Sequence, residues 1–370
     1  MKVVVTGQVG LDKKPVLRTL VELARSEGQD VALCNIGDMM YAEAPDVGPG
    51  KILNLPLSRL NNLRRSVFKD VLNAARTRAN VVVNTHSTFR WHHGLFYAFD
   101  HDQMNELGAD LYIVLVDNVD RIHYRLSRDG HVDHALKDLM VWREEEVLAT
   151  ELLSRIVRGH GRFYILSRGA DDEGRETAQT IARLMFHPDL PKAYLSFPMS
   201  HVGDSPELQA EIDAFREEMK KHLICFDPGD VEEKYLCKYV LEAVEKGQRT
   251  IRVGPAGAEA RMETSQVVEI LPDIDGQIYA RDFMLIDQSD MIISLVPELP
   301  GGRPGLSSGV ERELQHAHEA TKDVFVIWMP ECEPSPFITE TASRVFRGVE
   351  EAIRFFVERS SSTEGKGLFA

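Results

Sequence analysis

The chain has 370 residues, and 43 basic against 58 acidic residues give it a formal net charge of −15 at pH 7. This length predicts two domains, each large enough to bury a core of its own. An acidic surface has no general attraction for a phosphate backbone, so we expect no general nucleic-acid binding. A small anion can still be held by local backbone donors.

The four cysteines lie far apart and form no C-x-x-C pair, which predicts neither a zinc knuckle nor a disulfide framework. The chain opens on an apolar strand pattern without the features of a signal peptide. No apolar run reaches the roughly 18 residues that suggest a membrane span. We therefore expect a soluble, cytoplasmic protein that does not bind membranes.

In the first half, short runs of Val, Ile and Leu alternate with amphipathic stretches. Strands are expected at 3–5, 31–33, 81–83, 111–116 and 163–166. Helices are expected at 13–27, 59–78, 134–158 and 172–186. This alternation is typical of βαβ units with buried parallel strands. Two prolines in 187–191 then break the pattern and predict a domain boundary.

The second half repeats this pattern. Strands are expected at 193–197, 291–296 and 324–329, and helices at 206–222, 231–246, 309–320 and 341–358. The fold class is therefore α/β, with two doubly wound parallel-sheet domains. We place the domains at residues 1–188 and 189–358, followed by a flexible tail at 359–370.

Residues 7–14, GQVGLDKK, follow the first strand and precede a helix. A glycine turn in this position can hold phosphates with backbone N–H groups and the helix N-terminus. Gly7 and Lys13 match the pattern G-x-x-x-x-G-K-[ST], and Gly10 lies between them. Asp12 replaces a glycine and Lys14 replaces the hydroxyl residue, so a purely structural turn is an equal alternative.

Further along, Asn84 to Ser87 follow a strand, and the strand 111–116 leads to Arg125 and Arg128. This layout resembles the archaeal-type adenylate kinases over roughly residues 1–186. In that family an aspartate in place of Asn84 helps to hold Mg²⁺. The lid arginines that clamp phosphates correspond to Arg125 and Arg128.

The resemblance implies that ATP or another nucleotide binds through Gly7, Gly10, Lys13, Arg125 and Arg128. Phosphoryl transfer needs Mg²⁺ to neutralise charge on the bridging oxygens. Because the metal-binding hydroxyl and acid are both replaced, we predict a nucleotide-binding or architectural pseudokinase domain.

Three histidines, His86, His92 and His93, lie near the end of the third strand. Their spacing and the residues around them match no metal-ligand pattern, so a surface or substrate-loop role is favoured. We predict no metal site.

In the second half, residues 306–314, LSSGVEREL, follow a strand and open a helix. Ser307 or Ser308 can cap this helix, and Gly309 allows close approach of a ligand to the backbone. Glu313 then lies about one turn into the helix and can face the crevice above the strand ends. An ordinary capped helix with surface acids is the alternative.

This segment strongly resembles the nucleoside 2-deoxyribosyltransferase superfamily, including its 2′-deoxynucleoside 5′-monophosphate N-hydrolase branch. The matching residues, spread over about 193–330, are Tyr194 to Pro198, Ile278 to Asp282, Asp287, Asp290, Ser307 to Leu314, Ala317 and Lys322 to Val324. The resemblance implies that Glu313 attacks C1′ of the sugar or stabilises charge there. It implies that Asp282 assists departure of the base, and that Tyr194, Ser196 and Pro198 contact substrate.

These residue types suit cleavage of an N-glycosidic bond. The reaction develops oxocarbenium character at C1′, which a carboxylate can stabilise or capture. The leaving base needs a proton, which a carboxyl group of raised pKa can supply. Alternatively, Arg281 pairs with Asp282 and lowers its pKa, which would make it a poorer proton donor.

One position bears on the substrate. Where the transferases carry an aspartate that contacts nucleoside, the monophosphate hydrolases carry a serine that contacts phosphate, and this chain has Ser307. Ser308 can assist, and residues 297–305 can form a lid that carries Arg303 to the phosphate. The hydrolases' first phosphate-binding turn is not matched, and Ser200 and His201 are the candidates to replace it.

The sequence thus predicts an N-glycosidase that cleaves the base–sugar bond of a (deoxy)nucleoside 5′-monophosphate, by hydrolysis or base transfer, with no cofactor for the cleavage. A homo-oligomer is implied by the resemblance alone. One alternative is a nucleotide kinase of the adenylate kinase type. The other is a non-catalytic nucleotide sensor.

Overall fold

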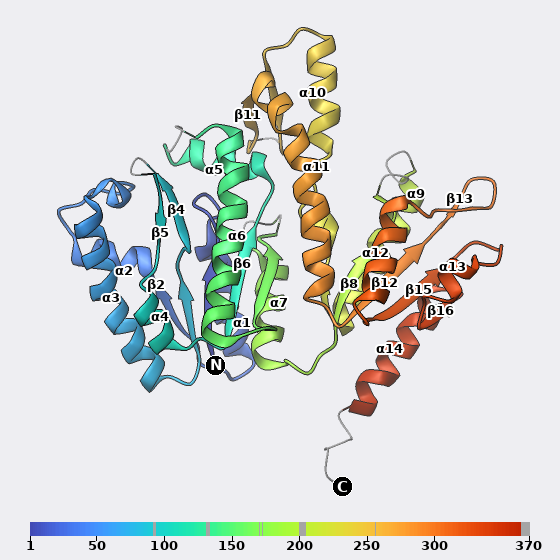
Figure 1. The fold of residues 1–370 in the computed structure, drawn as a ribbon, viewed down its shortest axis with the longest axis horizontal. Coiled ribbons are helices and arrows are strands. Elements are labelled where there is room, and N and C mark those ends of the chain that lie inside the picture. Colours follow the sequence, from blue (N-terminus) through green and yellow to red (C-terminus); the bar gives the residue numbers. More distant parts are fainter. Residues whose placement is uncertain are drawn as a thin grey trace. The chain divides into compact units, whose positions relative to one another are not determined.

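Figure 1 shows the fold in a computed structural model, which describes residues 1–91, 94–130, 134–169, 171, 173–199, 205–255 and 257–363. Two compact units divide the chain. The first comprises Met1–Ala182 and Val231–Gln277, and the second comprises Arg183–Asp230 and Ile278–Ala370.

The first unit contains a five-stranded parallel sheet with the strand order β2-β3-β1-β6-β7. Its strands are β1 (Lys2–Thr6), β2 (Ala32–Asn35), β3 (Val81–Asn84), β6 (Leu111–Val116) and β7 (Phe163–Ser167). All five strands expected from the sequence are confirmed. Because β1 is the central strand of this sheet, the loop that follows it lies at the centre of the edge formed by the carboxyl ends of the strands.

Helices surround this sheet. They are α1 (Lys13–Ser26), α2 (Ile36–Glu43), α3 (Leu57–Thr77), α4 (His101–Leu107), α5 (Val119–Arg128), α6 (Leu136–Arg158) and α7 (Arg175–Phe186). A 3-10 turn at Ile52–Asn54 and an antiparallel hairpin, β4 (Thr88–Trp91) with β5 (Gly94–Tyr97), complete this part. The sequence patterns predicted α1, α3, α6 and α7, but not α2, α4, α5 or the hairpin.

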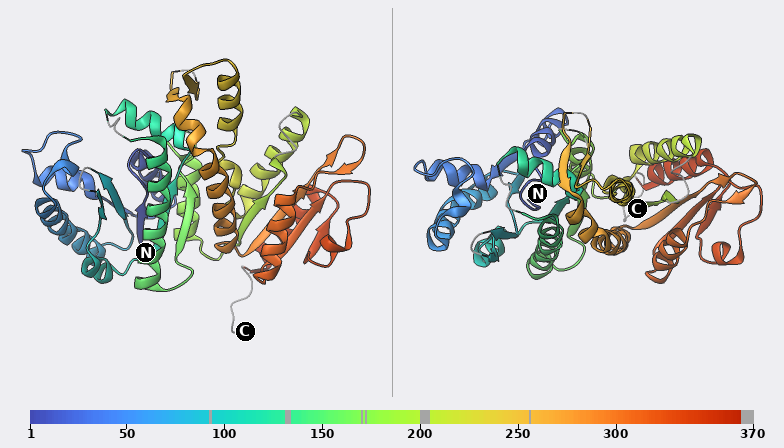
Figure 2. Two further views of the ribbon diagram at one scale, coloured as in Figure 1. Left: turned by 45° about the horizontal axis from the view of Figure 1, so that its top comes forward. Right: turned by 90° about the horizontal axis from the view of Figure 1, so that it is seen from above.

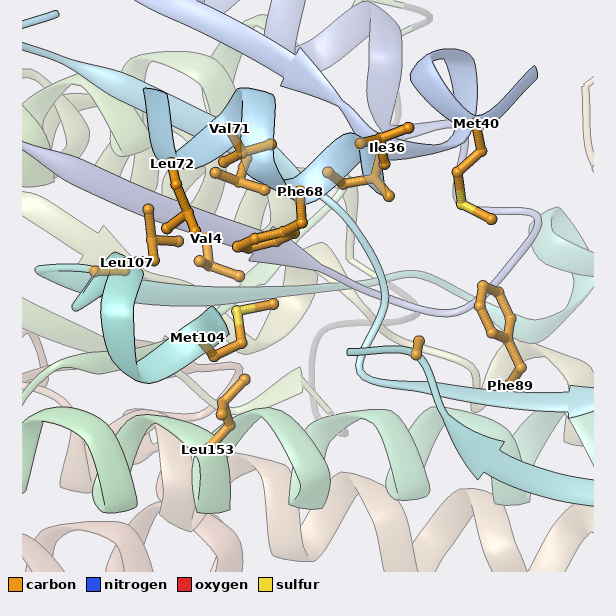
Figure 3. Packing of buried hydrophobic residues seen from close by; sticks show 14 of the residues in the cluster. Val4, Ile36, Met40, Phe68, Val71, Leu72, Phe89, Met104, Leu107 and Leu153 are labelled. Carbon is orange, nitrogen blue, oxygen red and sulfur yellow. The ribbon is translucent and has the colours of Figure 1, made fainter. Parts of the chain in front are cut away.

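A hydrophobic cluster of the first unit joins α3 and α4 to the sheet. Figure 3 shows Phe68, Val71 and Leu72 of α3 near Val4 of β1 and Leu107 of α4. Phe68, Val71 and Leu72 fall at helical spacing, so α3 buries one face, whereas β1 is buried on both faces because Val3, Val4 and Val5 are all fully buried.

A later segment of the chain, 231–277, belongs to the first unit. It contains α10 (Tyr235–Glu245), the hairpin β10 (Thr250–Val253) with β11 (Ala260–Glu263), and the first part of α11 (Thr264–Asp287). The predicted boundaries assign this segment to the second domain. Its attachment to the first unit depends on contacts far apart in the sequence, which strand and helix patterns do not report.

A buried ion pair fixes this segment. Both guanidinium nitrogens of Arg143 lie 2.9 Å from the carboxylate oxygens of Glu233, and both side chains are at most 2% exposed. The Val119 N–H also donates to this carboxylate, at 2.6 Å. Removing one partner of such a buried pair usually costs much more stability than replacing both partners with apolar residues.

We expect Glu233→Leu to lower the free energy of unfolding by about 3–5 kcal/mol, because it leaves the Arg143 charge buried without its partner. The double variant Arg143→Met/Glu233→Leu should recover much of this loss. Urea unfolding of the full chain measures both. Equal stability of the single and double variants would contradict this role of the pair.

The second unit contains another five-stranded parallel sheet, with the order β16-β15-β12-β8-β9. The strands are β8 (Lys192–Ser196), β9 (Ile224–Phe226), β12 (Met291–Val296), β15 (Asp323–Trp328) and β16 (Arg344–Phe346). Numbered within the unit, this is the order 2-1-3-4-5 of flavodoxin-like folds. Its topological switch point lies between β8 and β12. Two parallel α/β sheets therefore confirm the expected fold class.

The helices of this unit are α9 (Pro206–His222), the last part of α11 from Ile278, α12 (Ser308–Glu319), α13 (Pro336–Thr339) and α14 (Val349–Thr363), with a 3-10 turn at Pro228–Asp230. Figure 2 shows α9 and α14 on one face of the sheet and α12 on the other. The predicted helix 341–358 is wrong at its start, because β16 precedes α14. The predicted tail is wrong for 359–363, which continue α14, and 364–370 lie outside the described residues.

Among the described helices, none combines the length and apolar character needed to cross a bilayer.

Candidate functional site

The strongest site in the second unit is built at its switch point. Glu313 lies on α12, which packs on β12 and β15, and its carboxylate reaches the side chains of β8. Tyr194 and Ser196 are alternate residues of β8, so both point to the face that α12 covers. Crevices beside such switch points are where open α/β sheets bind ligands.

Two hydroxyl groups hold the Glu313 carboxylate. Tyr194 Oη donates to Oε1 at 3.1 Å, and Ser196 Oγ donates to Oε2 at 2.6 Å. Both hydroxyl residues are fully buried. The predicted substrate-binding role of Tyr194 and Ser196 stays a prediction, but the geometry gives both a positioning role that the sequence did not.

Tyr194 lies within the field of two carboxylates, Glu313 and Asp282 of α11. Burial raises the pKa of Glu313, while the hydrogen bonds from Ser196 and Tyr194 act in the opposite direction. Burial also raises the pKa of Tyr194 well above its usual value, and the charges of Glu313 and Asp282 add to this effect. Both carboxylates therefore lie within electrostatic reach of one phenol, and the division of the chemistry between Glu313 and Asp282 stays a prediction.

The start of α12 carries the predicted phosphate contacts. Ser307 is the N-cap, and its Oγ accepts a hydrogen bond from the Val310 N–H at 3.3 Å. Ser308 is the first residue of the helix and Gly309 the second. An added Cβ at Gly309 would meet only the Ser307 hydroxyl, at 3.6 Å, so neither the backbone nor its neighbours demand glycine there. The prediction that Gly309 lets a ligand approach the backbone closely stays a prediction.

The predicted lid, residues 297–305, contains a short hairpin of β13 (Glu298–Leu299) and β14 (Arg303–Pro304). Arg303 is exposed on it, and its role at a phosphate stays a prediction. Pro198 is buried just after β8. Ser200 and His201 lie outside the described residues.

In the first unit, the phosphate loop has the expected place between β1 and α1. An added Cβ at Gly7, where φ is 136°, would lie 2.4 Å from a Leu11 methyl and 2.7 Å from the Leu115 carbonyl oxygen. Asp12 caps α1 in the left-handed conformation, with φ 52° and ψ 55°. A glycine fits this conformation without strain, and aspartate is among the residues that tolerate it best.

Lys13 is buried in this loop. Its Nζ donates to the Gly7 carbonyl at 2.8 Å and lies 3.4 Å from Nδ1 of His86. Burial lowers the pKa of Lys13 to about 8, partly opposed by the charge of Glu146. Burial, helped by the charge of Lys13, lowers the pKa of His86 well below its usual value. At neutral pH the lysine is therefore the charged member of this pair.

The predicted lid arginines lie beside the same loop. Arg125 donates to the Gly10 carbonyl at 3.4 Å and to the buried Asp117 at 2.7 Å. Arg128 lies 3.7 Å from the Asp12 carboxylate. The structure therefore brings Gly7, Gly10, Lys13, Arg125 and Arg128 together.

The residues that replace the Mg²⁺ ligands of the adenylate kinases do not fit a metal ion. Lys14, in place of the hydroxyl, is an ammonium paired with Asp38. Asn84, in place of the acid, donates its amide to Asn35 Oδ1 at 2.9 Å. An ammonium repels a cation, and the neutral amide oxygen of Asn84 lacks the negative charge of the carboxylate that it replaces. Within the described residues, no group of three or more His, Cys, Asp or Glu side chains forms a metal site.

Glu146 of α6 is a residue of this loop that the sequence analysis missed. Its carboxylate accepts hydrogen bonds from the backbone N–H groups of Gly7 at 3.0 Å, Ser87 at 2.8 Å and Thr88 at 2.8 Å. It thereby connects the phosphate loop to the segment after β3. Its position 139 residues from Gly7 leaves no local signal that could have identified it.

A cavity of about 370 Å³ opens beside this loop. Its walls combine the loop and the start of α1 with α2, the 3-10 turn, α3, β3 and the hairpin strand β4. Lys13 and Arg125 line one part, and apolar side chains line another. The mixture of an apolar wall and a few polar groups is typical of small-molecule sites.

Comparisons with known proteins address this unit. A family model described as an AAA domain matches residues 6–142. An adenylate kinase from Methanoculleus marisnigri is 24% identical over 188 residues, which cover 46% of this chain and 95% of that protein. The first unit is kinase-like. The adenylate-kinase-like, nucleotide-binding character expected of it is confirmed at this level.

Two solved structures are also similar to the chain. Shikimate kinase from Acinetobacter baumannii, in complex with shikimate, covers 51% of this chain and 94% of its own at 16% identity and a TM-score of 0.34. Shikimate kinase from Bacteroides thetaiotaomicron covers 50% of this chain and 98% of its own at 12% identity and a TM-score of 0.35.

Proposed function

We propose that the second unit is an N-glycosidase that cleaves the base–sugar bond of a (deoxy)nucleoside 5′-monophosphate. The observation that carries this proposal is Glu313. It is a half-buried carboxylate at the switch point of a flavodoxin-like sheet, held on both oxygens by hydroxyl groups. Such a group is oriented before substrate arrives, so little reorganisation is needed in the reaction.

In this mechanism the C1′–N bond breaks and its electron pair leaves with the base. Asp282 supplies the proton that the departing nitrogen takes up. Glu313 stabilises the positive charge that develops at C1′, or forms a bond to it. Water then adds at C1′ and gives the sugar phosphate, whereas a second base in place of water gives transfer.

The phosphate of the substrate would bind at the start of α12. Ser307 still has its hydroxyl proton to donate, because its oxygen accepts from Val310. The N-terminus of a helix favours a negative charge. These features support a monophosphate substrate over a free nucleoside.

The test is chromatography of the full-length protein incubated with nucleosides, ribonucleotides and deoxynucleotides, each with and without a second base. Free base from a monophosphate supports hydrolysis, and exchanged base supports transfer. Cleavage of nucleosides in preference to their monophosphates would contradict the phosphate site. Intact substrates throughout would overturn the proposal.

Phosphoryl transfer by the first unit is the second candidate, favoured by its similarity to an adenylate kinase. The pairing of Lys14 with Asp38 and of Asn84 with Asn35 supports nucleotide binding without transfer instead. The same chromatograms distinguish these alternatives when Mg·ATP is added. Formation of ADP from a monophosphate acceptor would support kinase activity. Tight nucleotide binding without turnover by either unit would indicate a sensor.

The protonation state of Glu313 predicts how the activity depends on pH. A carboxylate that stabilises positive charge must be ionised, so activity is lost as the pH falls through its pKa. Burial raises this pKa, which places the acid limb of kcat/KM above the usual range of a glutamate. Tyr194→Phe removes a hydrogen bond that lowers this pKa, so the limb should move to higher pH. An unchanged limb would contradict this role, and Tyr279→Phe, an exposed tyrosine, is the control.

A further inference from the structure

Ser294 of β12 carries a buried hydroxyl group in the second unit. The residue is 0% exposed, and its Oγ has no hydrogen-bond partner within the described residues. A buried hydroxyl without a partner lowers the stability of a fold, and folded proteins contain few such groups. An alanine at this position of the strand would avoid that cost. The hydroxyl therefore requires an explanation other than packing.

The register of the sheet places Ser294 beside a residue of the Glu313 site. Ser294 of β12 is paired with Ser196 of β8 in this parallel sheet. Residues paired across neighbouring strands point to the same face, and successive residues of one strand point to opposite faces. Ile293 and Leu295 pack in the core formed with α9 and α14. Ser294 therefore points, like Ser196, to the face that α12 covers.

The side chain of Glu313 passes over the strand that carries Ser294. In the sheet, β12 lies between β15 and β8, and α12 packs on β12 and β15. The Glu313 carboxylate nevertheless reaches two hydroxyl groups on β8. To do so it extends from α12 across β12, on the face to which Ser294 points. The buried hydroxyl and the carboxylate therefore share one face of the sheet at its switch point.

Two hydroxyl groups of β8 donate to Glu313 in the structure. Tyr194 and Ser196 each have one hydroxyl hydrogen, and each gives it to a different oxygen of the carboxylate. A carboxylate can accept about four hydrogen bonds, so it has room for a third donor. An oxygen of Glu313 that turns away from β8 toward C1′ loses its donor on that strand. The Ser294 hydroxyl, on the next strand and with its hydrogen unused, can replace that donor.

We propose that Ser294 is a positioning residue for Glu313, and that its hydroxyl donates to the carboxylate when Glu313 turns toward C1′ in the transition state. This role rests on the glycosidase activity proposed above. A hydrogen bond that forms only in the transition state increases the rate without strengthening substrate binding. It also accounts for a buried hydroxyl that lacks a partner in the structure.

The test compares Ser294→Ala with the wild-type full-length protein. Urea unfolding should show that the variant is at least as stable as the wild type, because the hydroxyl has no hydrogen bond to lose. With a deoxynucleoside monophosphate as substrate, kcat should fall about tenfold while KM stays the same, as expected for loss of a hydrogen bond to a charged group in the transition state. Ser294→Cys, which keeps a side chain of similar shape but donates only weakly, should show the same loss of kcat.

Ser289→Ala is the matched control. Ser289 is a buried serine of the same unit, and its Oγ donates to the Leu285 carbonyl at 2.7 Å. Its replacement should lower the free energy of unfolding and leave kcat within about twofold.

The outcomes separate this role from the proposed function. Intact nucleotide with the wild-type protein would overturn the proposed function and the role of Ser294 together. Cleavage by the wild type with an unchanged kcat in Ser294→Ala would overturn the role of Ser294 alone. So would a loss of stability in Ser294→Ala as large as that in Ser289→Ala, because it would show that the hydroxyl is already bonded without substrate.

Discussion

Replacing Glu313 with glutamine is expected to reduce release of base from a nucleoside monophosphate by about 10³-fold or more. The amide keeps the size of the side chain. Its oxygen can accept a hydrogen bond from one of the two hydroxyl groups of Tyr194 and Ser196, and its NH2 group can donate to the oxygen of the other. The amide has no negative charge with which to stabilise C1′ and is a poor nucleophile. The loss should therefore appear in kcat, with the fold and the thermal unfolding midpoint preserved.

Glu311→Gln is the matched control for this variant. Glu311 lies in the first turn of the same helix and is exposed, so its replacement should leave the rate within about twofold. Similar rates for Glu313→Gln and the wild type would remove Glu313 from the mechanism. Equal losses in both variants would indicate a general effect on α12.

Replacing Asp282 with asparagine should lower the rate by about 10²–10⁴-fold for an ordinary purine, the range expected for a general acid. The loss should be much smaller for a substrate with an N7-methylated guanine, because that base leaves as a neutral molecule without a proton. A rate measured on both substrates separates proton donation from binding.

The control for Asp282 is Asp275→Asn, an exposed aspartate on the same helix. It should behave as the wild type on both substrates. An equal loss by Asp282→Asn on the methylated and the ordinary base would contradict a proton-donating role for Asp282. It would favour a role in holding the substrate.

Local patterns predicted all five strands of the first sheet and β8, β12 and β15 of the second, but not β9 or β16. The strands at 81–84 and 291–296 are almost entirely apolar, and such runs are buried on both faces in a parallel sheet. The loop after β1 and the capped start of α12 were also predicted, because glycine and hydroxyl residues after a strand are typical of turns and helix N-caps. Glu313 could be predicted as a candidate site residue because it lies about one helical turn after that capped start.

Contacts distant in sequence explain what the sequence did not predict. Residues 231–277 lie within the second predicted domain along the chain, but Glu233 pairs with Arg143 of the first unit. Glu146 holds the Gly7 N–H across 139 residues. Sequence periodicity identifies which face of an element is buried, but not the partner it meets there.

The central claim is that the second unit breaks an N-glycosidic bond with Glu313. Its most direct measurement is a time course of one deoxynucleoside monophosphate with the wild-type protein and with Glu313→Gln, without ATP, quantifying free base and sugar phosphate. We predict equal amounts of base and sugar phosphate from the wild-type protein and almost none from the variant. Intact nucleotide with both proteins, or equal base release by both, would contradict the claim.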